Sequence, residues 1–198
     1  MNQPFVEGVI EQARQVLERY HPSRIEDQSL VAAAVLMLMY EKAGEPYVLL
    51  IERTELVQHH KGQIAFPGGS CEECDLDARE TALREAFEEL GLQPGDVEII
   101  GQLDDVVTGS HFRVTPVVGV LKQAPYPFLL EEREVASILE VPLAHFQDER
   151  NFEMELRQRS NGQPVLMPAF NWNGYHIWGA TARILRQFLN LLNGHDGA

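Results

Sequence analysis

The chain has 198 residues, of which 44% are hydrophobic and 23% are charged. This length and composition predict one folded domain with a substantial core and exclude an intrinsically disordered chain. The excess of 30 acidic over 16 basic residues, a net charge of −14, excludes general nucleic-acid binding, which depends on a basic surface.

The spacing of apolar residues predicts helices at both ends of the chain and one in the middle. The terminal helices are expected over residues 5–20 and 181–192, where apolar residues recur every three or four positions. The middle helix begins at Asp77 or Ala78 and ends at Leu90, just before Gly91. A short helix is also expected over residues 144–146.

Strands are expected between these helices, where apolar runs are bounded by turn signals. They lie at residues 30–40, 47–53, 64–66, 97–103, 114–121, 164–170 and 175–178, and a further segment starts at residue 141. This order predicts the α/β class, with a mixed β-sheet sandwiched between α-helices in an α/β/α arrangement. Residues 1–27 are expected to form an N-terminal helix that packs on a domain of residues 28–194.

The composition also predicts where the protein acts. Two cysteines, Cys71 and Cys74, are too few for a disulfide framework, which favours a reducing compartment. The first residues lack the basic and apolar regions of a signal peptide, and the longest apolar stretch is about half the length that spans a bilayer. We therefore expect a cytoplasmic protein without a membrane or nucleic-acid partner.

Three carboxylates share one face of the middle helix. Helix residues lie about 100° apart, so Glu89 is about 40° to one side of Glu85 and Glu88 about 60° to the other. The opposite side, expected to pack into the core, carries Leu83, Ala86, Phe87 and Leu90. Clustered carboxylates suit Mg²⁺ or Mn²⁺, but Glu-rich helices are also common on solvated surfaces, so the helix alone leaves both interpretations open.

The loop before this helix favours the metal site. Phe66-Pro67-Gly68-Gly69 ends a strand, and tandem glycines let the backbone approach a ligand closely. A carbonyl of this loop, that of Gly68, is expected to complete the coordination of the metal. Asp75 or Asp77 is expected to cap the helix, and Arg84 to pair with Glu88 four residues later.

Taken together, these residues resemble the Nudix box, Gly-x5-Glu-x7-Arg-Glu-U-x-Glu-Glu-x-Gly-U, in which U is aliphatic. The matching residues are Gly69, Asp75 and Arg84-Glu85-Ala86-x-Glu88-Glu89-x-Gly91-Leu92, with Asp75 in place of Glu and eight residues rather than seven before Arg84. The resemblance implies a Nudix fold and divalent-metal-dependent hydrolysis of a pyrophosphate bond. It implies metal ligands at Glu85, Glu88, Glu89 and Gly68, and structural motif roles at Gly69, Asp75, Arg84 and Gly91.

Upstream residues are similar to the signature of the coenzyme A pyrophosphatase branch, Leu-Leu-Thr-x-Arg-[Ser/Ala]-x3-Arg-x3-Gly-x3-Phe-Pro-Gly-Gly. Leu49-Leu50, Arg53, Gly62 and Phe66-Pro67-Gly68-Gly69 match in register, whereas Ile51, Thr54 and Gln58 differ. That branch also has the longer box with Asp. The resemblance implies cleavage of coenzyme A or its derivatives to adenosine 3′,5′-bisphosphate and 4′-phosphopantetheine. The cations expected to bind the substrate phosphates are Arg53, Lys61 and Arg113.

The catalytic base and the substrate have open alternatives. A carboxylate can take the proton of the attacking water. Glu85 and, from a later acidic loop, Glu134 are the candidates. Nucleoside diphosphate sugars, ADP-ribose or dinucleotides are alternative substrates. A non-catalytic ligand-binding module is disfavoured because all three box carboxylates are present. Homodimers are common in the family, and the sequence leaves both the oligomeric state and the choice of metal open.

Overall fold

The computed structural model describes residues 3–55, 62–158 and 162–195. The helices are α1 (Gln3–Arg19), α2 (Ala78–Leu90), α3 (Leu143–Gln147) and α4 (Gly179–Leu192), with 3₁₀ turns at Pro94–Asp96 and Glu149–Asn151. The strands are β1 (Val31–Lys42), β2 (Glu45–Arg53), β3 (Ile64–Ala65), β4 (Gly68–Ser70), β5 (Val97–Gln102), β6 (Val106–Val107), β7 (Phe112–Leu121), β8 (Val135–Pro142), β9 (Phe152–Gln158), β10 (Pro164–Trp172) and β11 (Tyr175–Trp178).

The described strands form a large mixed sheet and a small antiparallel one. The large sheet has the order β3-β2-β1-β7-β5, with β4 paired to β1, β6 to β7 and β8 to β2. The pair β1–β7 is parallel, whereas the pairs β1–β2 and β1–β4 are antiparallel. The small sheet has the order β11-β10-β9. β1 is therefore the strand around which the large sheet is organised.

β1 is buried on both faces, which explains its uninterrupted apolar sequence. Leu36 and Leu38 face a core shared with α2, whereas Met37 and Met39 face a second core shared with α1 and α4. Successive side chains of a strand point to opposite faces, so one apolar run supplies both cores. Through these two cores, β1 packs against helices on both faces of the sheet.

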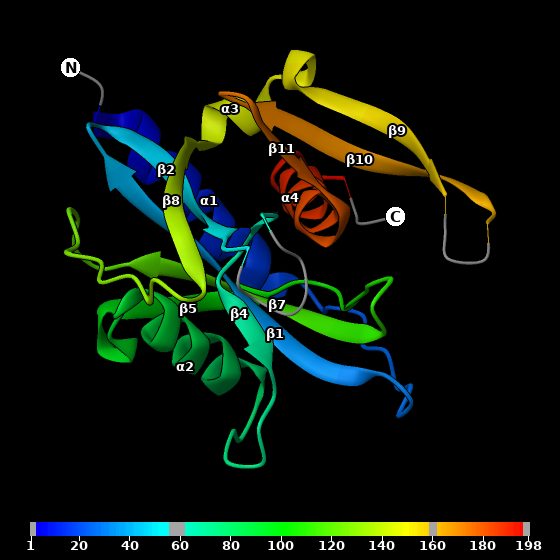
Figure 1. Ribbon diagram of the computed structural model, residues 1–198. Coiled ribbons are helices and arrows are strands. Elements are labelled where there is room, and N and C mark those ends of the chain that lie inside the picture. Colours follow the sequence, from blue (N-terminus) through cyan, green and yellow to red (C-terminus); the bar gives the residue numbers. More distant parts are fainter. Residues whose placement is uncertain (1–2, 56–61, 159–161, 196–198) are drawn as a thin grey trace.

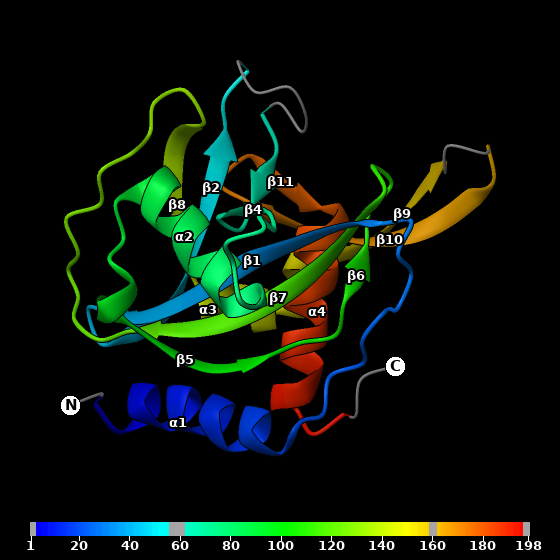
Figure 2. The ribbon, with the colours of Figure 1, turned by 90° about the horizontal axis from the view of Figure 1, so that it is seen from below.

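The helices lie on both faces of the large sheet, as the sequence predicts (Figures 1 and 2). α2 covers one face, and α1, α3, α4 and the small sheet cover the other. α1 packs on β5, where Leu17 lies against Gly101. The boundary between residues 27 and 28 stays a prediction. None of the described helices is long and apolar enough to span a membrane.

The predicted helices are confirmed, but four parts of the strand prediction were wrong or incomplete, one of them the short β6, which was not predicted. The glycine segment expected to be a loop forms β4, and the segment expected to start at residue 141 begins at Val135 as β8. β9 was not predicted at all. Its apolar residues Met154 and Leu156 are 50% and 72% exposed, and they alternate with charged residues. β9 is defined by pairing with β10 rather than by burial, so no strong local signal marks it.

Candidate functional site

Two residues set the ends of α2 and therefore the positions of its carboxylates. Asp77 accepts hydrogen bonds from the backbone N–H groups of Arg79 (2.7 Å) and Glu80 (3.1 Å), which caps the helix. Gly91 adopts the left-handed conformation, with φ of 66°, at the other end. The helix begins and ends where the sequence predicts, and the cap is Asp77 rather than Asp75.

Glu89 is the most deeply buried carboxylate of α2, with 2% of its side chain exposed. Its Oε1 accepts a hydrogen bond from Arg53 Nη1 at 3.1 Å, and its Oε2 accepts one from the backbone N–H of Gly68 at 2.9 Å. Burial raises the pKa of Glu89 to about 8; Arg53 and the Gly68 N–H oppose this shift, whereas Glu85 and Glu134 add to it. The single charge of Arg53 therefore does not offset the burial of this carboxylate, and a bound cation would add the positive charge that does.

Glu85 lies directly against the glycines of β4. A Cβ at position 69 would lie 2.5 Å from Glu85 Oε1, far inside normal contact distance. Glycine at this position therefore allows β4 and the carboxylate to approach each other this closely. The Glu85 side chain is 15% exposed, and burial raises its pKa despite the opposing charge of Arg84.

Arg84 joins the carboxylates of α2 to the loop before the helix. Its Nε and Nη2 donate to the two oxygens of Asp75 at 3.1 and 3.0 Å, and Nη2 also donates to the carbonyl of Ser70 at 2.9 Å. Its Nη1 lies 2.9 Å from Glu85 Oε1 and 3.2 Å from Glu88 Oε2. The hydrogen bonds from Arg84 hold the pKa of Asp75 at about 2. Asp75 thus stays charged and orients Arg84.

The outer side of α2 carries Glu88 and Phe87, which are 53% and 45% exposed. The prediction that Phe87 packs in the core was wrong. The residues that pack α2 on the sheet are Ala82, Ala86 and Leu90. This stripe turns Glu89 inward, and Phe87, about 160° away around the helix, consequently points to solvent.

The loop before β8 brings Glu134 beside the same cluster. Its backbone carbonyl accepts a hydrogen bond from the N–H of Thr54 at 2.9 Å, which ties the loop to the end of β2. The Glu134 side chain is 50% exposed and lies 3.8 Å from Arg53 Nη2. Arg53 therefore stands between the buried Glu89 and the accessible Glu134. The role of Glu134 as a base stays a prediction.

A groove of about 1790 Å³ opens at this cluster. Its floor includes Ala33 of β1 and Val114 of β7. One wall is formed by β3, β4 and the acidic loop, and it reaches the cluster at Arg53, Gly68, Gly69 and Glu134. The other wall is formed by β9, β10, the end of β11 and the start of α4, and it includes Val165, Leu166, Met167, Pro168 and Trp178. The groove therefore joins a charged end to a wall whose β10 residues are apolar.

The three basic residues that were expected to bind substrate differ in their position relative to the groove. Arg53 lines the groove, with its guanidinium held by Glu89. Arg113 does not line it, because its neighbours Phe112 and Val114 face the groove and strand alternation turns Arg113 to the other face. There its Nη1 donates to the carbonyl of Ile25 at 2.7 Å. Lys61 lies outside the described residues.

Sequence reasoning missed three cations that line the groove, namely Arg133, Arg157 and Arg183. Arg133 precedes Glu134 in the acidic loop, and its position next to a predicted site residue could have identified it as a residue of the groove. Arg157 lies on the unpredicted β9, where its guanidinium stacks 3.9 Å from the ring centre of Trp178. The sequence offered no signal for that stacking, because it joins two strands separated by β10.

The donor set of the cluster fits a divalent cation. The carboxylates of Glu85, Glu88, Glu89 and Glu134 lie around two guanidinium groups, those of Arg53 and Arg84. This arrangement leaves excess negative charge on hard oxygen donors, which Mg²⁺ and similar ions prefer. The missing side chain at position 69 leaves the space that the Glu85 carboxylate occupies, and a Cβ there would fill it. The fold and this donor set together are typical of the class of enzymes that hydrolyse phosphate anhydrides and generally use a divalent cation.

Comparison with known proteins identifies the family. The NUDIX domain model matches residues 30–156, and the chain belongs to this family. It is a Nudix hydrolase, an enzyme of a family that acts on pyrophosphate bonds of nucleotide derivatives and generally uses divalent cations.

Two relatives support this assignment, and one solved structure shares the fold. The protein described as "Uncharacterized Nudix hydrolase NudL" of Cronobacter sakazakii is 37% identical over 156 residues, which cover 78% of this chain and 79% of that protein. The protein of the same description from Salmonella paratyphi B is 38% identical over 155 residues, with the same coverage of 78% and 79%. The crystal structure of a NUDIX hydrolase from Nitrosomonas europaea has a TM-score of 0.55 and 15% identity, covering 87% of this chain and 78% of that chain. That similarity shows a shared fold.

Proposed function

We propose that this Nudix hydrolase cleaves the pyrophosphate bond of coenzyme A or its derivatives, giving adenosine 3′,5′-bisphosphate and 4′-phosphopantetheine. The observation that carries the proposal is the groove, which runs from the charged cluster to the apolar wall of β10. A pantetheine arm is long and uncharged, so an apolar wall suits it better than it suits a sugar. The match of Leu49-Leu50, Arg53 and Gly62 to the coenzyme A signature supports the same substrate class.

The cations of the groove are proposed to hold the phosphates of the substrate. Arg53 and Arg133 both line the groove beside Glu134. A guanidinium donates two parallel hydrogen bonds to a phosphate, which fixes its orientation as well as its position. These residues replace Arg113 in the proposal, because the guanidinium of Arg113 contacts Ile25 on the other face of the sheet.

The carboxylates of α2 are proposed to hold Mg²⁺ or Mn²⁺ together with the carbonyl of Gly68. Such ions, when bound, neutralise the phosphoryl oxygens and lower the pKa of a bound water. Glu134 is proposed to take the proton of the attacking water, because it is half exposed at the groove and lies beside Arg53. Glu85, which is more buried, is the alternative base. Arg84 keeps Glu85 and Glu88 in place.

A substrate panel tests the proposal. The protein is incubated with Mg²⁺ or Mn²⁺ and, separately, with coenzyme A, ADP-ribose, sugar nucleotides and dinucleotides, and the products are separated by chromatography. We expect kcat/KM to be highest for coenzyme A or a thioester of it. A sugar nucleotide or dinucleotide turned over faster than coenzyme A would refute the substrate assignment. Tight binding without turnover of any substrate would refute catalysis.

Two variants test the assigned residues. Glu89→Gln should lower turnover by orders of magnitude in a folded protein, because it removes a negative ligand from the cluster. Glu134→Gln should lower kcat about 10²–10⁴-fold if Glu134 is the base. Glu132→Gln, an exposed neighbour in the same loop, is the matched control and should keep normal activity. A normal kcat in Glu134→Gln would show that Glu134 is not the base and would favour the alternative, Glu85.

A further inference from the structure

The small sheet brings together three side chains of types that bind metal ions, at a place separate from the carboxylates of α2. Glu153 and Glu155 on β9 and His176 on β11 each offer a ligand atom, and these atoms all lie within 4.8 Å of one another. We propose that the three side chains form a second cation site, which takes Zn²⁺ or a similar first-row transition ion. This proposal does not depend on the proposed function.

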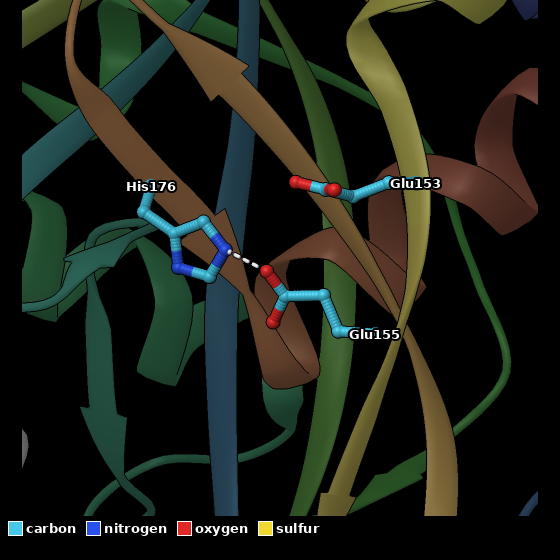
Figure 3. A group of neighbouring side chains, drawn as sticks. All are labelled: Glu153, Glu155 and His176. Atoms are coloured by element: carbon cyan, nitrogen blue, oxygen red, sulfur yellow. Dashed lines mark hydrogen bonds and ion pairs between the residues drawn. The ribbon is translucent and has the colours of Figure 1, made fainter.

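The strand register explains why these side chains meet. Residues two apart on a strand share a face, so Glu153 and Glu155 point the same way from β9. β10 lies between β9 and β11, with Ala169 opposite Glu153 and Asn171 opposite His176. The small side chain of Ala169 leaves space above the middle strand, where longer side chains from the two outer strands approach each other (Figure 3).

Glu155 is held with one oxygen directed toward the imidazole. Its Oε2 lies 2.9 Å from Arg157 Nε and 2.8 Å from Arg157 Nη2, and the Arg157 guanidinium is stacked on Trp178. Its Oε1 lies 2.6 Å from His176 Nε2 (Figure 3). Glu153 is fixed through its Oε1, which accepts a hydrogen bond from Asn171 at 2.6 Å. The ligand atoms are therefore positioned by contacts with Arg157 and Asn171.

The charge of the cluster favours a cation. Arg157 forms an ion pair with Glu155 and neutralises one of the two carboxylates. The polar contact of Glu153, to the amide of Asn171, supplies no opposing charge. A divalent ion between Glu153, Glu155 and His176 would therefore meet net negative charge, with one imidazole nitrogen in reach.

The donor types select the class of ion. Mg²⁺ takes oxygen ligands in octahedral geometry, whereas Zn²⁺ accepts imidazole nitrogen together with carboxylate oxygen, often with three protein ligands and a water. Glu155 and His176 are 25% and 34% exposed, so water reaches the site and completes the coordination. This donor set differs from the all-oxygen cluster of α2, and the two sites should therefore prefer different ions.

Zinc titration of the 198-residue chain tests the proposal. Chelator-treated protein is titrated with Zn²⁺ in excess Mg²⁺, which occupies oxygen sites but competes poorly for imidazole. The parent is compared with His176→Gln, Glu153→Gln and, as a matched control, the exposed His21→Gln. We expect the parent and His21→Gln to bind one equivalent of Zn²⁺ that both cluster variants bind more than about tenfold more weakly. Zn²⁺ should also shift the ring-nitrogen NMR signals of His176.

Three results would overturn the proposal. They are equal Zn²⁺ affinity in the parent and both cluster variants, absence of binding by the parent, and a ring-nitrogen shift at another histidine in place of His176. Circular dichroism and thermal unfolding show whether each variant is folded. Glu153→Gln keeps the test valid if His176→Gln unfolds, because Glu153 is exposed and its replacement preserves shape.

Discussion

Replacing Arg84 by alanine removes the group that joins Asp75 to the carboxylates of α2. Asp75 then loses two charge-assisted hydrogen bonds, each worth about 1.5–3 kcal/mol. Because its side chain is only 5% exposed, water does not replace them. It keeps hydrogen bonds from Thr81 Oγ1 and from the N–H of Glu72. The lost contact with the exposed Glu88 adds less than about 1 kcal/mol. We therefore expect the free energy of unfolding to fall by about 3–5 kcal/mol.

Urea denaturation of the chelator-treated protein, followed by circular dichroism, measures this loss. Asp75→Asn in the Arg84→Ala background should recover part of it, because asparagine leaves no unpaired buried charge. If the free energy of unfolding of Arg84→Ala lies within about 1 kcal/mol of that of the parent, the reasoning is refuted, because a loss of that size is typical of a surface ion pair. A double variant less stable than Arg84→Ala would also refute it.

The same ion pair predicts a dependence on pH. Arg84 holds the pKa of Asp75 at about 2, below its ordinary value near 4. A lowered carboxylate pKa contributes stability that is fully present above the unfolded pKa and is lost as the pH falls through the folded pKa. The parent should therefore lose this contribution between about pH 4 and pH 2, and Arg84→Ala should lack that part of the fall.

Three further substitutions test the cluster. Burial raises the pKa of Glu89 to about 8, so the metal-free parent should lose stability as the pH rises from about 4.5 through 8, and Glu89→Gln should gain stability relative to the parent over that range in urea denaturation. Gly69→Ala should displace Glu85 and weaken Mn²⁺ binding more than about tenfold, measured by electron paramagnetic resonance, with little change in thermal unfolding. Gly68→Ala should unfold at a lower temperature than Gly69→Ala, because its Cβ would lie 2.4 Å from the carbonyl of Ala34 at a φ of 153°.

Each of these has a result that contradicts it. A stability difference between Glu89→Gln and the parent that stays constant with pH would mean that Glu89 does not titrate with a raised pKa. Unchanged Mn²⁺ affinity in Gly69→Ala would mean that Glu85 is not held against β4; Gly95→Ala, with open space around its Cβ, is the control. Equal thermal unfolding of the two glycine variants would show that β4 shifts freely away from β1.

The sequence predicted α2 well because its signals are local. The cap at Asp77, the left-handed Gly91 and the carboxylate spacing all act within a few residues of the helix. The rotation of the helix on the sheet is a tertiary property, and it decided that Glu89 is buried and Phe87 exposed. The sequence shows the small side chains of Ala82 and Ala86, but the shape of the sheet decides that these residues, and not Phe87, pack against it.

The groove was less predictable because its residues come from paired strands. Whether an arginine of a strand faces the groove depends on its register, and one position of alternation separates Arg113 from its groove-lining neighbours. Arg157 lies on β9, whose exposed Leu156 and Met154 gave no pattern of burial. Local motifs therefore located the metal cluster, and only the sheet pairings located the opposite wall.

The division of the groove between two walls has a consequence for how such enzymes diversify. The cluster wall lies within the residues that match the family, 30–156, whereas most of the opposite wall comes from β10, β11 and α4, which follow them. Substitutions at Leu166 or Trp178 would reshape the space for a ligand without moving Glu85 or Glu89. A lineage can thus keep one reaction while exchanging the molecule on which it acts, and relatives with the same box need not share a metabolite.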